Sequence, residues 1–368
     1  MGLTKLQQDC LRNRFSDRVS TDLIERKIYS HDVGVMPPLV KPLIGKATAD
    51  AVVQPRNEKE IVELVRWARE EGVPLIPRGK ATSGYGGVLP VEGGVIVDFW
   101  RMRRILTVDE ERLTATVEPG MVWEDLESEL AKRDLALRLY PSSAPSSTVG
   151  GWLAQGGFGY GSFEFGAFPD NVVSARVVLP DGEVREFNED DLDFVADAEG
   201  ITGIITEVTL KLRPRERERV IGARFADPGQ LTRALQAMVD HELPLWSMSF
   251  VNPEMAELKN RRPPKLEHGK SADEHRPEIP QAYIGVFVFP ASRAGEVEEA
   301  LGRVVGQSGG SLIDPDLAAH EWDERFSIMH VKRLGPSLIP AEVVLPLEGL
   351  ADALRDIEDC IRLPLVIE

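Results

Sequence analysis

The stretch that decides the fold runs from residue 77 to residue 90 and reads Pro77-Arg78-Gly79-Lys80-Ala81-Thr82-Ser83-Gly84-Tyr85-Gly86-Gly87-Val88-Leu89-Pro90. It combines glycines with two cations and two aliphatic hydroxyls, and it follows an apolar segment that predicts a strand over residues 73–76. Glycine has no Cβ, so backbone N–H groups in such a loop can approach a ligand closely. A concave run of N–H groups beside one or two cations is suited to bind a diphosphate. A glycine-rich surface loop without a ligand is the alternative that this stretch alone leaves open.

A second glycine-rich stretch, residues 141–161 (PSSAPSSTVGGWLAQGGFGYG), strengthens the ligand-binding interpretation. A Walker A loop requires Gly-Lys-Ser/Thr, but Gly79-Lys80 is followed by Ala81. The dinucleotide fingerprint Gly-x-Gly-x-x-Gly fails at residues 84–89 and 157–162, which end in Leu and Ser. We therefore predict a large phosphate-bearing cofactor between two glycine-rich edges, and neither NTP hydrolysis nor a nicotinamide cofactor.

The composition narrows the class of protein. The chain has 368 residues, 42% hydrophobic and 28% charged, which is enough for two or three domains with proper cores. Its formal net charge of −17 argues against a nucleic-acid partner, because a phosphate backbone would be repelled. No apolar run approaches the roughly 20 residues that span a bilayer, and no signal peptide is evident. Two cysteines, Cys10 and Cys360, are too few for a disulfide framework or a metal cluster, so we expect a cytoplasmic protein, which a partner could hold at the membrane surface.

Three regions are expected along the chain. Residues 1–45 predict a helical lead-in, 46–214 a domain made of two subdomains, and 215–368 an α+β domain built on an antiparallel sheet. The subdomains are expected at 46–106, a small α/β unit, and at 107–214, which is rich in strands. Asn57 and Gly72 predict the start and the end of one amphipathic helix.

The third region alternates strand and helix patterns. Strands are predicted at 220–225, 283–289 and 343–345, with a further one at 363–368, and helices at 229–241, 293–306 and 349–361. Residues 252–280 carry prolines, lysines and glutamates with few apolar positions, so we expect a long exposed excursion there. The basic run at residues 101–104 is interpreted as a solvated turn.

Five motifs fall in an order that resembles a known family. They are Val53-Gln54-Pro55, Pro77-Arg78-Gly79, Val117-Glu118-Pro119-Gly120, Thr148-Val149-Gly150-Gly151 and Glu199-Gly200-Ile201-Thr202-Gly203-Ile204-Ile205-Thr206. Together they resemble the PCMH-type FAD-binding domain of the vanillyl-alcohol oxidase and p-cresol methylhydroxylase superfamily, over residues 49–214. Within it the chain is most similar to the flavoprotein subunits of D-lactate dehydrogenase and glycolate oxidase. The resemblance implies an α+β fold: a two-subdomain FAD-binding domain, then a partial cap domain with an antiparallel sheet.

The resemblance also implies which residues hold the FAD. The loop from Arg78 to Gly84 would bind the diphosphate through its N–H groups, and residues of the second stretch would lie on the other side of the cofactor. A third segment, around Gly203, would present main-chain groups to the adenine. The implied cofactor-binding residues are Arg78, Gly79, Lys80, Ala81, Thr82, Ser83, Gly84, Tyr85, Pro141, Ser142, Thr148, Gly150, Gly151, Gly156, Gly157, Gly203, Ile204 and Ile205.

Three departures from the family pattern matter. The family often has Gly-Gly where this chain has Lys80-Ala81, and Lys80 either adds charge at the diphosphate or points to solvent. Thr82 stands where members with covalent FAD often carry a histidine, so we expect non-covalent FAD. Region 215–368 resembles the substrate cap of these enzymes but stops early, so we expect either a piece of a longer protein or a chain that another polypeptide completes.

Catalytic candidates come from the cap. A 2-hydroxy acid needs a cation for its carboxylate and a base for its hydroxyl proton. Arg325, in a segment resembling the family's Trp-x-x-Arg, is the candidate carboxylate clamp, with a surface arginine paired to Asp323 or Glu321 as the alternative. His330 and His320 are candidates for the base, and no spacing predicts a metal site.

The leading functional hypothesis is therefore an FAD-dependent dehydrogenase that oxidises a 2-hydroxy acid such as D-lactate or glycolate. It would pass electrons to an iron–sulfur protein, another protein acceptor or a quinone. The alternative is a flavin-carrying electron-transfer subunit of a larger iron–sulfur complex without its own substrate site. A reductase acting on a sugar nucleotide is a weaker third hypothesis, for which the cap sequence offers nothing specific.

Overall fold

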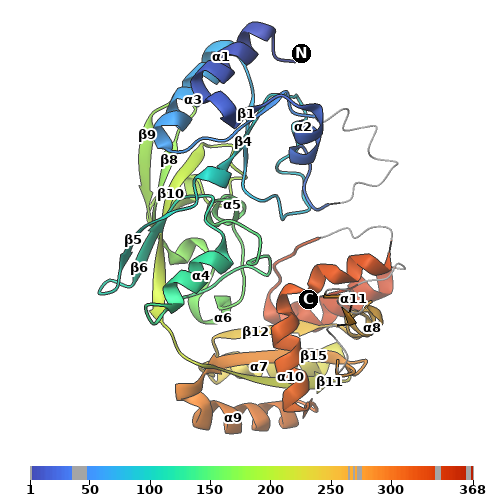
Figure 1. The fold of residues 1–368 in the computed structure, drawn as a ribbon. Helices are drawn as coiled ribbons and strands as arrows, with labels where there is room; N and C mark the ends of the chain where they lie inside the picture. The colour runs from blue at the N-terminus through green and yellow to red at the C-terminus, as the bar shows by residue number, and fades with distance from the viewer. Residues whose placement is uncertain are drawn as a thin grey trace. The chain divides into compact units, whose positions relative to one another are not determined.

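The computed structural model describes residues 2–34, 48–263, 266–267, 270–271, 276–335, 341–361 and 366–367. The chain divides into two compact units, one of residues 1–159 and 165–215 and the other of residues 160–164 and 216–368. We call them unit 1 and unit 2 (Figure 1). The predicted limits between domains, at 45/46 and 214/215, remain predictions, and the second lies one residue from the division between the units.

Unit 1 begins with a four-stranded sheet in the order β1-β2-β4-β3. Its strands β2, β4 and β3 are parallel, and β1 is antiparallel to β2. Three helices accompany this sheet, and the bounds are β1 Val19–Ser20, β2 Ala51–Val53, β3 Leu75–Arg78, β4 Val95–Asp98, α1 Lys5–Phe15, α2 Leu23–Tyr29 and α3 Glu58–Glu71. The N-terminal segment is thus more than a helical lead-in, because it contributes β1 to the sheet and buries Leu11 and Phe15 completely in the core.

The local signals for α3 explain its position. Asn57 Oδ1 accepts a hydrogen bond from Glu60 N at 3.0 Å, and Gly72 ends the helix with φ +64°. Ile61, Leu64 and Ala68 lie on its buried face, at the spacing of one helix side. Helix α3 connects β2 to β3, and the two strands run in the same direction. The glycine-rich loop follows the carboxyl end of β3.

The second sheet of unit 1 is antiparallel, with the order β5-β6-β10-β8-β9 and β7 paired to β10. The predicted turn at 180–182 does join β8 to β9. Helices α4 and α5 also belong to this part, and the bounds are β5 Ile105–Asp109, β6 Thr114–Val117, α4 Trp123–Ala131, β7 Leu135–Leu137, α5 Val149–Gln155, β8 Val172–Val178, β9 Val184–Asn188 and β10 Ile204–Pro214. The short helix α6, Ser162–Phe165, follows α5 in the chain.

Unit 2 contains the antiparallel sheet β12-β15-β11-β16. Every residue of β15 is buried. Tyr283, Phe287 and Phe289 enter one hydrophobic cluster and Ile284 enters another, which places helices on both faces. Helices α7, α9 and α11 pack with Phe287, and α8 and α10 pack with Ile284. The bounds are β11 Glu218–Phe225, α7 Pro228–Asp240, β12 Ser247–Val251, α8 Pro253–Arg261, β13 Leu266–Glu267, β14 Lys270–Ser271, β15 Tyr283–Pro290, α9 Ala294–Gln307, β16 Ser311–Leu312, α10 Pro315–Asp323 and α11 Leu350–Cys360.

Two sequence-based predictions for unit 2 are wrong. Residues 343–345 form no strand, and Val344 is 81% exposed. The predicted excursion at 252–280 begins with α8; Lys259 within this helix and Arg262 just after it are buried because they pair with Glu321 and Glu324. Ion pairing lets charged residues occupy interior positions, which a polarity pattern alone does not reveal. The predicted strand at 363–368 lies largely outside the described residues.

The α+β fold class, with a second unit that contains an antiparallel sheet, is confirmed. No helix in the described part of the chain is long and apolar enough to cross a membrane.

Candidate functional site

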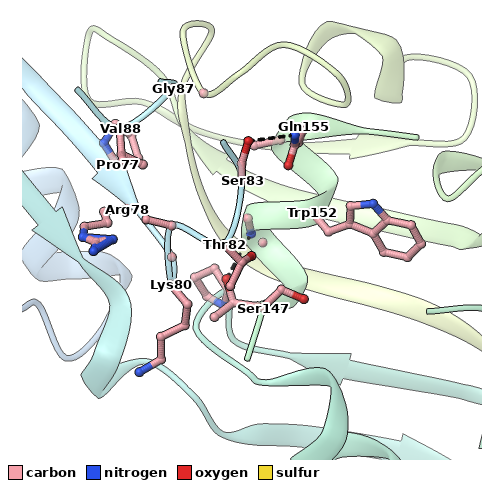
Figure 2. A pocket seen from close by; sticks show the side chains of 18 of the residues that line it. Pro77, Arg78, Lys80, Thr82, Ser83, Gly87, Val88, Ser147, Trp152 and Gln155 are labelled. Atoms are coloured by element: carbon pink, nitrogen blue, oxygen red, sulfur yellow. Dashed lines mark hydrogen bonds between the residues drawn. The ribbon is translucent and has the colours of Figure 1, made fainter. Parts of the chain in front are cut away.

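A cleft in unit 1 opens where β3 ends, between the glycine-rich loop and α5. Its empty space, including the open mouth, is about 900 Å³. Figure 2 shows the loop with Lys80, Thr82 and Ser83 passing alongside the helix that carries Trp152 and Gln155. The two glycine-rich stretches that the sequence singled out therefore form facing edges of one cleft.

The loop offers a row of backbone donors. None of the N–H groups of residues 79–84 donates a hydrogen bond to another described residue. Because no protein group takes these N–H groups, they can donate to water or to a ligand, and residues 79–83 line the cleft. Such a row suits an anion with several oxygen acceptors.

The two edges approach each other closely at Gly79. A Cβ built there would lie 2.4 Å from Thr148 Oγ1 and 3.7 Å from Gly151 Cα. Thr148 Oγ1 itself accepts the hydrogen bond from Gly151 N at 3.3 Å that caps α5. Glycine at 79 is thus required by the contact with the opposite edge, since no positive φ constrains it.

Behind the cleft, Gly150 packs on Pro119. A Cβ at Gly150 would lie 2.5 Å from Pro119 Cβ, and Gly150 N donates to Pro119 O at 2.9 Å. Two of the family-like motifs, Val117–Gly120 and Thr148–Gly151, therefore meet through this contact.

The loop is held by partners that the sequence analysis did not identify. Asp32 Oδ2 accepts a hydrogen bond from Gly86 N at 2.8 Å, and Val33 N donates to Ser83 O at 3.2 Å. Gln155 Nε2 donates to Ser83 Oγ at 3.1 Å, as the dashed line in Figure 2 marks. No sequence signal pairs Asp32 with residue 86, because the contact joins segments 54 residues apart.

Ala81 adopts the left-handed region with φ +50°. Such a conformation costs an L-residue about 1–2 kcal/mol relative to glycine. The sequence has Lys80-Ala81 where the family that it resembles often has Gly-Gly, and alanine at position 81 therefore carries backbone strain.

Arg78 supplies a partly buried cation at the start of the loop. Burial lowers the pKa of Arg78, and the neighbouring carboxylate of Asp98 opposes that shift. Its Nε and Nη1 atoms are buried and have no hydrogen-bond partner among the described residues, while its guanidinium lies 5.2 Å from the Tyr29 ring centroid. Burial also raises the pKa of Asp98, which accepts a hydrogen bond from Gln54 Nε2 at 2.7 Å. An unpartnered arginine at a cleft edge is available to an anionic ligand.

Lys80 was expected either to add charge at the diphosphate or to point to solvent, but its ammonium contacts an aromatic ring instead. Its ammonium lies 3.9 Å from the Trp100 ring centroid, in a cation–π contact. Burial lowers the pKa of Lys80, and the charge of Asp98 opposes this.

Eleven of the predicted cofactor residues line the cleft: Arg78, Gly79, Lys80, Ala81, Thr82, Ser83, Thr148, Gly150, Gly151, Gly203 and Ile205. Gly84, Tyr85, Pro141, Ser142, Gly156, Gly157 and Ile204 do not line it. Ile204 packs into the core of the first sheet instead. The lining residues that were not predicted are Asp32, Pro77, Gly87, Val88, Phe99, Pro119, Ser143, Ser147, Trp152, Ala154, Gln155, Glu199 and Gly200.

The cap candidates lie in unit 2. Arg325 lines a small pocket, and its guanidinium lies 4.1 Å from the Trp322 ring centroid and 4.3 Å from that of Phe326. Its Nη1 donates to Trp322 O at 2.7 Å. His330, half-buried in the 3₁₀ turn Ile328–Leu334, is not among the residues that line this pocket, and neither is His320.

Comparison with known proteins gives two family matches. Residues 49–188 match the family described as "FAD binding domain", and residues 214–362 match "FAD linked oxidases, C-terminal domain". The chain is 37% identical over 176 residues to glycolate oxidase subunit GlcD of Bacillus subtilis, covering 45% of this chain and 37% of that protein. It is 26% identical over 358 residues to the mitochondrial D-lactate dehydrogenase [cytochrome] of Arabidopsis thaliana, covering 93% of this chain and 60% of that protein.

Among solved structures, an alkyldihydroxyacetonephosphate synthase superposes with a TM-score of 0.80 at 22% identity, covering 97% of this chain and 75% of that one. This likeness concerns the fold. The chain spans from about a third to three fifths of the length of the two relatives named above. The resemblance drawn from the five motifs is thereby confirmed.

Proposed function

The chain belongs to the FAD-linked oxidases with a PCMH-type FAD-binding domain, and from this premise we propose that it is an FAD-dependent dehydrogenase of a 2-hydroxy acid such as D-lactate or glycolate. The observation that carries the proposal is the cleft of unit 1, with its unpaired N–H groups at residues 79–84. The similarity to glycolate oxidase and D-lactate dehydrogenases supports the substrate class.

The residues of the cleft fit FAD. The N–H groups at 79–84 would donate to the diphosphate oxygens, and Arg78 would add a positive charge. Gly79 is tight against Thr148, so the loop approaches the opposite edge without a side chain between them. Gly203 and Ile205 line the same cleft and would contact the adenine end.

Non-covalent attachment is part of the proposal. The described residues that line the cleft include neither histidine nor cysteine, which are side chains suited to a covalent flavin bond. Acid precipitation of the FAD-loaded protein should leave the flavin in the supernatant. Flavin that stays with the pellet would contradict this part.

FAD, when bound, supplies the acceptor for the hydride that leaves the substrate carbon. Arg325 would hold the substrate carboxylate, oriented by the rings of Trp322 and Phe326. His330 remains a proposed base for the hydroxyl proton, and an electron-acceptor protein or quinone would take the electrons onward.

The test is anaerobic mixing of the FAD-loaded protein with D-lactate or glycolate while the visible flavin absorption is followed. Bleaching supports the proposal. Arg325→Met should slow bleaching about 10- to 100-fold, the value of one charge-assisted hydrogen bond. Arg303→Met, an exposed arginine paired with Glu299 on α9, is the matched control and should change nothing. A protein that binds FAD and is photoreduced, but is not bleached by these acids, would instead be a flavin-carrying electron-transfer subunit.

A further inference from the structure

An exposed depression in unit 1 gathers positive charge. It is lined by Arg56, Asn57, Trp100, Arg101, Arg103 and Arg104, at the end of β4 and the start of α3. We call it the arginine face. Residues 101–104 are predicted from the sequence to be a solvated turn, and in the structure the three arginines of this turn line the depression together with Arg56 and Trp100.

Most of this charge lacks a carboxylate partner. Arg104 pairs with Glu118 at 2.7 Å, and Arg101 Nε donates to the Gln54 amide at 3.2 Å. The side chains of Arg56, Arg101 and Arg103 form no ion pair with any residue the structure describes, although the charge of Arg56 still acts on the nearby Glu60 and helps to lower its pKa. Because the whole chain carries a formal charge of −17, unneutralised arginines clustered on one face are opposite in sign to the rest of the protein.

Trp100 gives the arginine face a fixed aromatic centre. It is 43% exposed, yet Lys80 Nζ lies 3.9 Å and Arg103 Cζ 4.1 Å from its ring centroid. These two cation–π contacts hold the indole in place while leaving much of it open to a partner. Tryptophan and arginine are the residues most enriched at the energetic centres of protein interfaces.

Acidic proteins match this face better than small anions do. The depression is open to solvent, so a free phosphate would keep most of its hydration and gain little. The net charge of −17 repels a polyanion at long range, but this repulsion is screened within about a Debye length. At contact, a surface with several carboxylates could pair with three guanidinium groups at once and cover the indole. We propose that the arginine face is the docking surface for an acidic protein partner.

The position of the face connects it to the cofactor cleft. Lys80 lines that cleft, and its ammonium rests on Trp100, which lines the arginine face. A partner docked here would therefore sit beside the cleft. If the chain has the proposed dehydrogenase function, the partner would be an acidic electron carrier.

The test uses the full chain loaded with FAD and needs no substrate turnover. Binding of fluorescently labelled poly-L-glutamate is measured by anisotropy at low salt. We expect saturable binding that weakens with salt, because counter-charges screen surface contacts. Arg101→Glu with Arg103→Glu should weaken it at least tenfold. Arg112→Glu with Lys132→Glu, the same charge change at two exposed positions outside the face, should weaken it less than threefold.

A second variant separates docking from simple attraction of charge. Trp100→Ala keeps every guanidinium and should still weaken binding about fivefold or more, with FAD content and melting temperature as the check on folding. Equal losses in both charge-reversal variants, or no saturable binding by the native protein, would overturn the proposal. Displacement by phosphate beyond that by chloride at matched ionic strength would also overturn it, since the face would then be a small-anion site. Failure of 2-hydroxy acids to bleach the flavin would leave this binding result unaffected.

Discussion

Replacing Gly79 by alanine is expected to disable the cofactor cleft through one contact. The new Cβ would lie 2.4 Å from Thr148 Oγ1, about 1 Å closer than an ordinary van der Waals contact. One edge must therefore move away from the other. Overpacking of this kind costs about 1–3 kcal/mol, and displacing even one N–H donor from a charged oxygen costs about 1.5–3 kcal/mol more. We expect FAD affinity to fall about 10²- to 10⁴-fold.

The assay is fluorescence titration of the apoprotein with FAD, in a double-mutant cycle with Thr148→Ala. Removing Oγ1 deletes the atom that the new Cβ strikes, although it also removes the cap of α5 at a cost of about 1 kcal/mol. The double variant should therefore bind FAD better than Gly79→Ala alone, by about tenfold. Gly302→Ala on α9, where a Cβ meets nothing within 4 Å, is the control and should bind like the native protein.

Two results would refute this reasoning. If Gly79→Ala binds FAD within twofold of the native chain, the two edges are not coupled. Alternatively, the two substitutions could weaken binding additively, which would mean that the Cβ–Oγ1 contact is not the cause.

Three further substitutions test the glycine-rich loop and the Arg18–Glu60 ion pair. Ala81→Gly should relieve about 1–2 kcal/mol of left-handed strain at an entropy cost of about 0.5–1 kcal/mol, so the melting temperature should stay level or rise slightly and FAD affinity should be kept. A loss of more than about 1 kcal/mol of stability would contradict this. Burial raises the pKa of Glu60, but hydrogen bonds from Arg18 and from Arg56 N outweigh it, so the net pKa is lowered. That contribution to stability is present above the unfolded pKa of about 4.3 and is lost as pH falls below it. Glu60→Gln should therefore destabilise at pH 7 by about 2 kcal/mol and much less at pH 3, seen in denaturant melts. Asp32→Asn removes the charge that holds Gly86 N and should weaken FAD binding about threefold to tenfold by titration, with no change in melting of unit 2; unchanged affinity would count against a role for Asp32 in holding the loop.

Local signals in the sequence were enough for much of the fold. Asn57 and Gly72 mark the ends of α3 because caps act within a few residues. The turn at 180–182 likewise depends on neighbouring residues alone, and it joins β8 to β9 as expected. The glycines of both stretches are visible in the sequence because a close approach of two backbones requires residues without a Cβ.

What the sequence did not reveal depends on contacts between distant residues. Lys259 and Arg262 are polar in sequence but interior in the fold, since their partners lie 62 residues away. Asp32 reaches Gly86 across a similar separation. Residues 343–345 are apolar and include two β-branched valines, a pattern that predicts a strand. They pair with no strand among the described residues, and Val344 is exposed, so this prediction is wrong. Ile204 was assigned to the cofactor from a motif, whereas strand alternation turns it to the core and leaves Ile205 at the cleft.

The most direct test of the account is backbone amide exchange of residues 79–84 with and without FAD. These N–H groups have no partner among the described residues, so they should exchange fast in the apoprotein. Saturating FAD should slow their exchange at least tenfold, while amides of α9 in unit 2 should change little. FAD that binds stoichiometrically and leaves residues 79–84 exchanging at the apoprotein rate would contradict the central claim, because the cofactor would then be held elsewhere.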